Sequence, residues 1–259
     1  MSWQSPAEKL LQSLGISDPR DIDLEAIAFD QGATVKYRPL KGCEARIVGF
    51  GNRAVITVDN AQHSLRRVRF STAHELGHWY SHRGRSLMCR SEDIGNPSHS
   101  VLDPERVADS YAADLLLPRY LFVPRARTIG RTNIEAVEKL ADEFETSKKS
   151  TAIRLVEYGP EPAMLVCHGK EGRKWFNLPK RIPERWFPKK ELDADSYALD
   201  VLYGKSRRSR RVLIGADAWF DNPGAGEFEL YEQTMKGWGD EVLTILTFKD
   251  GEMLEDLDF

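Results

Sequence analysis

The chain has 259 residues, of which 41% are hydrophobic and 30% are charged, and its formal net charge is −3. These values predict a soluble globular protein with room for two domains, and they argue against a protein that coats nucleic acid or an anionic membrane with its whole surface. Three scattered cysteines without a C-x-x-C pair argue against a disulfide framework, and without a signal peptide or an apolar membrane span we expect a cytoplasmic protein with no membrane partner.

The N-terminal part of the chain predicts two short helices followed by three strands. Residues 6–15 and 21–28 have amphipathic spacing, and their apolar faces are expected to pack together. Residues 33–37, 45–50 and 54–58 are β-branched or aromatic runs separated by Gly, Pro and Asn. This pattern predicts a small sheet built from hairpins.

The next segment predicts a long helix that begins near Ser64 and carries a His-Glu-x-x-His motif. His74 and His78 are four residues apart, so a helix directs both imidazoles at one point, as a zinc ion requires. Glu75 is rotated by about 100° from His74, outside the ligand pair but near a metal-bound water, where its carboxylate can act as general base. For this motif alone, an exposed polar helix face is the alternative interpretation.

Residues 83–102 are rich in Gly, Ser, Arg, Asp and Pro, and they predict a loop. Two histidines lie in or beside this loop, His82 and His99. Each could add to the metal site or stabilise an oxyanion. A lone loop histidine is more commonly a solvated side chain. After the loop, Asp103 as a cap and Pro104 at the first helical position predict a second helix.

This second helix supplies a third candidate ligand. Glu105 and Asp109 share one helical face. Two histidines and a glutamate with one open position form a known coordination set of catalytic zinc. Asp109 is placed to accept the second N–H of a ligand histidine, which fixes its tautomer. The predicted Zn²⁺ ligands are therefore His74, His78 and Glu105.

Both motifs together resemble a known family. His74-Glu75-Leu-Gly-His78, preceded by Arg69-Phe70-Ser-Thr-Ala73 and followed by Glu105-x-x-Ala108-Asp109-x-Tyr111-Ala112-x-x-Leu115-Leu-Leu-Pro118, is similar to the ImmA/IrrE family of bacterial metallopeptidases. The resemblance covers roughly residues 5–160. Asp109, Tyr111 and Leu117 depart from the Asn, Phe and Met that are usual in the family, and none of the three is a proposed ligand.

The resemblance implies a gluzincin-like zinc protease of the bacterial cytoplasm, in which the His-Glu-x-x-His helix and a downstream glutamate hold the metal. Known relatives cleave helix-turn-helix repressors and so derepress mobile-element or DNA-damage genes. A helix-turn-helix repressor is therefore the expected protein substrate.

Residues 133–144 and 146–156 predict two helices across a tight turn, an arrangement that resembles a helix-turn-helix. Lys148, Lys149 and Arg154 on the second helix suit phosphate contacts. Two observations argue against DNA binding: helix pairs of this spacing are common structural units, and the first helix is acidic.

From Ala163 onward the sequence predicts a β-rich module. One short helix is expected at 192–203. The expected strands are 163–167, 174–178, 211–214, 216–220, 227–231 and 241–248. A basic segment, residues 205–211, carries five positive charges in seven residues: Lys205, Arg207, Arg208, Arg210 and Arg211. Such a run is usually a solvated loop, but with nearby aromatic residues it is also a candidate site for an anionic effector such as single-stranded DNA or a nucleotide.

The sequence thus predicts an α+β protein in three parts: a zincin-like metallopeptidase core at residues 1–125, a helix-turn-helix-like segment at 126–160, and a C-terminal α+β regulatory or sensor module at 161–259. The leading function is a zinc-dependent endopeptidase that derepresses mobile-element or stress-response genes. The alternative is a non-catalytic zinc-containing regulator that binds a repressor or DNA. Glu75 favours the enzyme, because a structural zinc site needs no general base.

Overall fold

The computed structural model describes residues 4–62, 64–82, 87–88 and 103–255. By its contacts the chain divides into two compact units. Unit 1 comprises Met1–Phe122 and Asp142–Ser147, and unit 2 comprises Val123–Ala141 and Lys148–Phe259. The three-part division expected from the sequence remains a prediction.

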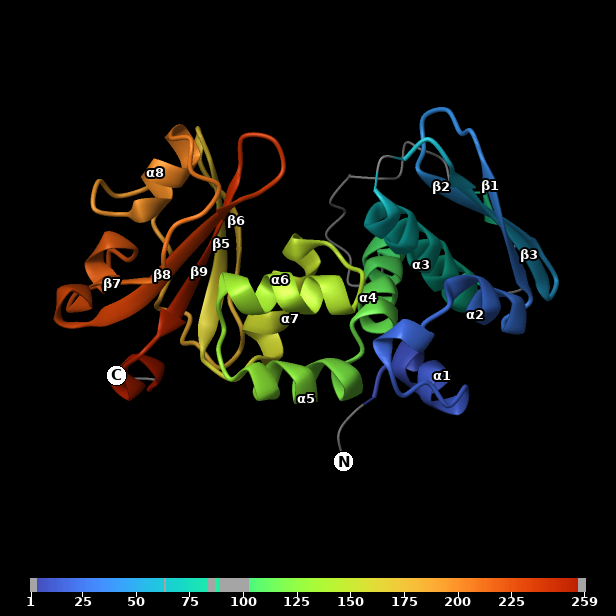
Figure 1. The fold of residues 1–259 in the computed structure, drawn as a ribbon, viewed down its shortest axis with the longest axis horizontal. Helices are drawn as coiled ribbons and strands as arrows, with labels where there is room; N and C mark the ends of the chain where they lie inside the picture. The colour runs from blue at the N-terminus through green and yellow to red at the C-terminus, as the bar shows by residue number, and fades with distance from the viewer. Residues whose placement is uncertain (1–3, 63, 83–86, 89–102, 256–259) are drawn as a thin grey trace. The chain divides into compact units, whose positions relative to one another are not determined.

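Unit 1 combines helices with a four-stranded sheet, of which the sequence predicts three strands (Figure 1). Ser5 caps the first helix through the backbone N–H of Glu8, whose side chain accepts in return from Ser5, and Asp23 caps the second. The elements are α1 (Pro6–Ser13), η1 (Pro19–Asp21), α2 (Leu24–Asp30), β1 (Ala33–Arg38), β2 (Ala45–Phe50), β3 (Arg53–Asp59), α3 (Leu65–His82), β4 (Leu87–Met88) and α4 (Pro104–Leu116).

The sheet of unit 1 has the strand order β1-β3-β2-β4. Strands β2 and β3 form the expected antiparallel hairpin, which turns at Gly51 with a φ of 59°. The expectation that β1 also belongs to a hairpin is wrong, because β1 pairs parallel to β3. After β1 the chain first forms β2 and then returns as β3, which lies between β1 and β2. Strand β4 was not predicted, since residues 83–102 were expected to form a loop throughout.

One face of this sheet packs on α3. Ile47, Ile56 and Val58 are fully buried on that face, as their alternation predicts. Gly49 faces Trp79 of α3 so closely that a Cβ on Gly49 would lie 2.5 Å from the indole ring. The indole N–H of Trp79 also donates to the carbonyl of Gln31 over 2.8 Å. The sheet therefore fixes the position and rotation of α3.

Unit 2 is built on a five-stranded antiparallel sheet with the order β6-β5-β9-β8-β7. Figure 1 shows α6 and α7 on one side of this sheet and α8 on the other. The helices and strands after α4 are α5 (Arg119–Ile129), α6 (Ile134–Glu143), α7 (Lys148–Tyr158), β5 (Ala163–Gly169), β6 (Gly172–Asn177), α8 (Tyr197–Tyr203), β7 (Val212–Gly215), β8 (Glu229–Lys236) and β9 (Val242–Phe248). The α+β class and the β-rich C-terminal module are confirmed.

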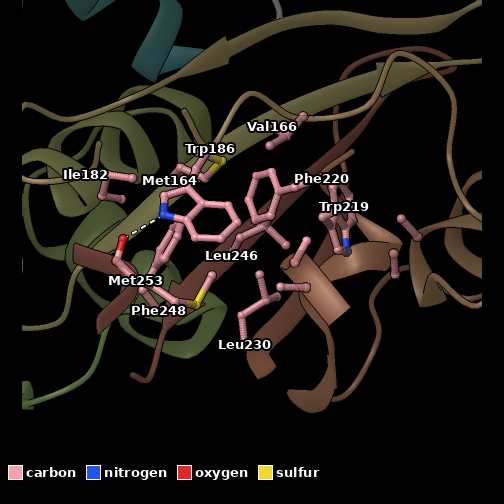
Figure 2. Packing of buried hydrophobic residues seen from close by; sticks show 14 residues of the cluster. Met164, Val166, Ile182, Trp186, Trp219, Phe220, Leu230, Leu246, Phe248 and Met253 are labelled. Atoms are coloured by element: carbon pink, nitrogen blue, oxygen red, sulfur yellow. Dashed lines mark hydrogen bonds between the residues drawn. The ribbon is translucent and has the colours of Figure 1, made fainter. Parts of the chain in front are cut away.

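The core of unit 2 is aromatic (Figure 2). Trp186, Trp219 and Phe220 pack against the sheet, and the indole N–H of Trp186 donates to the carbonyl of Met253. The strand expected at 216–220 is wrong. Residues Ala216–Ala218 instead form a 3₁₀ turn, η2, which folds the two following aromatic side chains into the core. Helix α5 was not predicted, because Pro124 lies inside it.

Candidate metal centre

Helices α3 and α4 bring two histidines and a glutamate together. The Nε2 atoms of His74 and His78 lie 3.0 Å apart. One carboxylate oxygen of Glu105 lies 3.1 Å from Nε2 of His74, and the other lies 3.2 Å from Nε2 of His78. One ligand atom from each residue can be chosen so that all lie within 4.8 Å of one another. These are the three residues that the sequence predicts as metal ligands.

The site depends on a close approach of the two helices. Gly77 faces Ala108, and a Cβ on Gly77 would lie 2.8 Å from the Cα of Ala108. The Asp103 side chain caps α4 by accepting from the N–H of Glu105, which puts Glu105 in the first helical turn. The sequence predicts the cap but not the Gly77–Ala108 contact, whose signal is a small residue at each facing position.

Asp109 lies one turn beyond Glu105 and holds the other nitrogen of His74. Its carboxylate is 2.8 Å from Nδ1 of His74, so Nδ1–H donates to Asp109 and Nε2 faces Glu105. Burial disfavours the charged form of His74, but the hydrogen bond and negative charge of Asp109 outweigh it and raise the pKa of His74. The predicted role of Asp109 as an orienting residue matches this geometry.

Glu75 is set apart from the three grouped residues. It is 5% exposed, and among the described residues its Oε2 atom has no hydrogen-bond partner. Burial raises the pKa of Glu75 to about 7, against the opposing effect of His74. A buried carboxylate oxygen without a hydrogen-bond partner is costly to maintain. Next to a ligand cluster, it is what a proton acceptor for a bound water requires.

The donor set fits a divalent cation. Two imidazole nitrogens and a carboxylate oxygen are the ligands that zinc takes in open, catalytic sites. Burial raises the pKa of Glu105 too, against the effect of His74, so the ionised carboxylate lacks full compensation from the described side chains. A cation between the three residues would supply that compensation. We therefore find that the residues present suit a zinc ion.

We assign no oxyanion-stabilising hydrogen-bond donor among the described residues around the site. Tyr80 stacks on Tyr111, with ring centroids 5.1 Å apart, and Tyr111 is buried. Tyr80 is 53% exposed. The side chain of His82 and all of His99 lie outside the described part of the structure.

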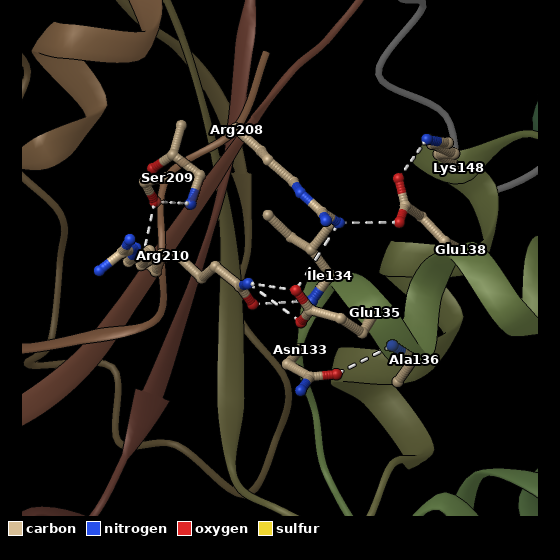
Figure 3. A network of polar contacts seen from close by, with 11 residues as sticks. Asn133, Ile134, Glu135, Ala136, Glu138, Lys148, Arg208, Ser209 and Arg210 are labelled. Atoms are coloured by element: carbon tan, nitrogen blue, oxygen red, sulfur yellow. Dashed lines mark hydrogen bonds and ion pairs between the residues drawn. The ribbon is translucent and has the colours of Figure 1, made fainter. Parts of the chain in front are cut away.

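The basic segment, residues 205–211, is partly engaged inside unit 2 (Figure 3). Arg208 contacts Glu138 at 3.0 Å, and Glu138 also pairs with Lys148. Arg211 pairs with Glu161 at 3.1 Å and lies 3.9 Å from the ring centroid of Tyr231. The remaining cations, Lys205, Arg207 and Arg210, are exposed. An anion-binding role for this segment stays a prediction.

The cations expected to contact DNA from α7 are also engaged. Lys149 lies 4.7 Å from the ring centroid of Trp175. Arg154 is 6% exposed and lies over the ring of Tyr158. The structure brings α6 and α7 together as a helix pair, but it uses these side chains for packing within unit 2.

Comparisons with known proteins identify a family and a similar fold. The sequence profile of the IrrE N-terminal-like domain, Peptidase_M78, matches residues 28–156, which include both metal-site helices. No curated protein matches the chain. A solved structure of a Mycobacterium tuberculosis transcriptional regulator is similar, with a TM-score of 0.59 and 15% sequence identity over 94% of this chain and 74% of that chain. At this identity the likeness concerns the fold. None of the helices in the described ranges has both the length and the apolar character that a membrane span needs.

Proposed function

Because the chain belongs to the ImmA/IrrE family through its IrrE N-terminal-like domain, we propose that it is a zinc-dependent endopeptidase. The observation that carries this proposal is the grouping of His74, His78 and Glu105, whose ligand atoms lie within 4.8 Å of one another. The unpartnered carboxylate oxygen of Glu75 beside that group favours catalysis over a purely structural metal.

His74, His78 and Glu105 would hold the metal. When bound, zinc supplies a Lewis acid that polarises the scissile carbonyl and makes water acidic enough to be deprotonated near neutral pH. Asp109 keeps Nδ1 of His74 protonated, so that the lone pair of Nε2 is free to bind the metal. Gly77 allows α4 to approach closely enough for Glu105 to reach both histidines.

Glu75 would move the proton. Its buried Oε2 accepts a proton from the attacking water as the C–O bond forms at the scissile carbonyl. The same carboxyl then donates that proton to the leaving amine as the C–N bond breaks. A pKa near 7, raised by burial, suits a group that must take up and release a proton at neutral pH.

We propose that the protein acts in the cytoplasm and that its substrate is a helix-turn-helix transcriptional repressor. Cleavage of the repressor would derepress mobile-element or stress-response genes. Family membership supports this choice. The similar solved structure carries the description of a transcriptional regulator, which fits a role in gene control. We also propose that the C-terminal module regulates the peptidase.

The test uses the purified full chain and a helix-turn-helix repressor as the candidate substrate. We expect fragments of the repressor that are absent when a chelator is present and that form again when zinc is added. Fragments that form equally well with the chelator contradict a metal-dependent mechanism. A stable complex without fragments, in the presence of zinc, favours the non-catalytic regulator instead.

A further inference from the structure

Unit 2 contains a cavity that none of the catalytic residues lines. Its volume is about 420 Å³, within the range of about 300–1,000 Å³ that is typical of small-molecule sites. Three cations, one aromatic ring, one carboxylate and one amide line it, from three segments of the chain: Arg173, Phe187, Lys189, Lys190, Asp221 and Asn222.

Backbone contacts hold these segments in place. The N–H of Arg173 donates to the carbonyl of Lys190 over 2.6 Å, which ties β6 to the segment that follows Phe187. The N–H of Lys189 donates to the carbonyl of Trp219 over 2.8 Å, and Pro188 forms a β-bridge with Phe220. Trp219 and Phe220 belong to the buried core, so the cavity walls rest on a rigid support.

The charges of the cavity are not balanced. The Nη1 atom of Arg173 is buried and, among the described residues, has no hydrogen-bond partner. Its guanidinium lies 4.4 Å from the ring centroid of Phe187 and 5.2 Å from that of Phe176, so aromatic rings rather than carboxylates surround it. Within the described part of the chain, no acidic side chain pairs with Lys190 either. The buried Nη1 donor of Arg173 is costly unless a hydrogen-bond acceptor contacts it.

The acidic residues nearby serve only one of the three cations. Lys189 contacts Asp193 at 3.0 Å and Asp221 at 3.6 Å. Asp221 is 84% exposed at its side chain, so it can turn towards solvent or towards a ligand hydroxyl. The lining therefore carries three positive charges against one negative charge. It favours an anion.

The cavity also offers a surface for a planar group. Phe187 is 54% exposed, so part of its ring is open to a ligand. Its ring meets that of Phe176 edge to face, with centroids 4.9 Å apart, which fixes its orientation. A rigid, half-exposed ring next to unpaired cations is the combination that binds a base and its phosphate together.

We propose that this cavity binds a small phosphate-bearing molecule with a planar ring, in the class of nucleoside monophosphates. Arg173 and Lys190 contact the phosphate, Phe187 stacks with the ring, and Asn222 and Asp221 bond to polar groups between them. The basic segment is less suited, because Arg208 and Arg211 already pair with Glu138 and Glu161. The inference concerns binding alone, so its failure would leave the peptidase proposal untouched.

Isothermal titration calorimetry on the full chain tests this inference. The probes are adenosine 5′-monophosphate, adenosine and inorganic phosphate at fixed ionic strength. We expect the monophosphate to bind at least about tenfold more tightly than either fragment, since one charge-assisted hydrogen bond changes affinity by about tenfold or more. Equal affinity for inorganic phosphate and the monophosphate contradicts the contact with Phe187, and absence of binding by the monophosphate overturns the proposal.

Charge-removing variants then locate the site. Arg173→Met and Lys190→Met should each weaken binding of the monophosphate by about tenfold or more. Lys190 is exposed, so its variant remains informative if Arg173→Met fails to fold. The matched control is Arg210→Met, which removes the same charge from an exposed position of unit 2 outside the cavity. If Arg210→Met weakens binding as much as Lys190→Met does, the anion binds elsewhere and the proposal is wrong.

Discussion

Gly77 on α3 and Ala108 on α4 touch so closely that a methyl group on Gly77 would lie 2.8 Å from the Cα and 2.9 Å from the carbonyl oxygen of Ala108. Both are backbone atoms, which cannot move without shifting a helix. His78 and Glu105 flank this contact from opposite helices, and their side chains meet at 3.2 Å. The distance between the proposed metal ligands is therefore set by a residue that is not a ligand.

Gly77→Ala should weaken both folding and metal binding. Overpacking costs about 1–3 kcal/mol, whereas alanine in place of glycine gains only about 1 kcal/mol of helix propensity. The net effect is destabilisation, with α4 displaced from α3. Chemical denaturation and competition with a zinc-sensitive dye measure the two losses. Gly251→Ala, where a Cβ meets open space, is the control; equal metal affinity in the Gly77→Ala protein and the parent would show that the helix spacing does not govern the site.

Asp109→Ala should lower zinc affinity by about 10–100-fold, because His74 loses the acceptor that orients its ring. Asp109→Asn keeps an oxygen that can accept from Nδ1, and it should retain most of the affinity. Competition with a chelator of known affinity ranks the two variants. If they bind zinc equally well, the bond between Asp109 and His74 has no orienting role.

Much of this site can be predicted from the sequence because it depends on residues that are only a few positions apart in the chain. The spacing of His74 and His78, and the cap at Asp103, are helical relationships that span a few residues. The parallel pairing of β1 with β3 and the contact of Gly77 with Ala108 are not local, since they join segments that no short-range pattern connects. The basic segment shows the same limit: the partners of Arg208 and Arg211 lie far away in the sequence.

Arg211 and Arg210 are neighbours with opposite structural roles. Arg211 pairs with Glu161 and stacks on Tyr231 with 15% of its side chain exposed, whereas Arg210 is exposed. Arg211→Met should lower the free energy of unfolding by about 1–3 kcal/mol, and Arg210→Met by less than about 0.5 kcal/mol. Urea titration followed by tryptophan fluorescence measures both. Equal effects would place Arg211 in solvent, against the structure.

Stability should fall in mild acid because of His168. This side chain is fully buried, and burial lowers its pKa to about 4, so the folded protein keeps it neutral. The unfolded chain takes up a proton below a pH of about 6.5, so the folded state progressively loses up to about 3 kcal/mol between pH 6.5 and pH 4. Above that window His168 contributes no pH dependence.

His168→Gln should remove this loss. The comparison with the parent isolates His168 from Glu232, whose pKa is raised by burial and whose contribution therefore has the opposite sign. Urea denaturation at pH 7 and pH 5 gives the required difference. Parallel pH profiles for the parent and the variant would mean that His168 is not held neutral in the folded state.

The central claim is that Glu75 moves a proton while His74, His78 and Glu105 hold a zinc ion. Its most direct test is cleavage of the repressor by the Glu75→Gln protein, with bound zinc measured on the same sample. We predict bound zinc equal to that of the parent and cleavage slowed by at least about 100-fold, the usual contribution of a general base. Glu171→Gln, at an exposed position, should cleave at the parental rate. Full cleavage by Glu75→Gln with zinc retained would contradict the account.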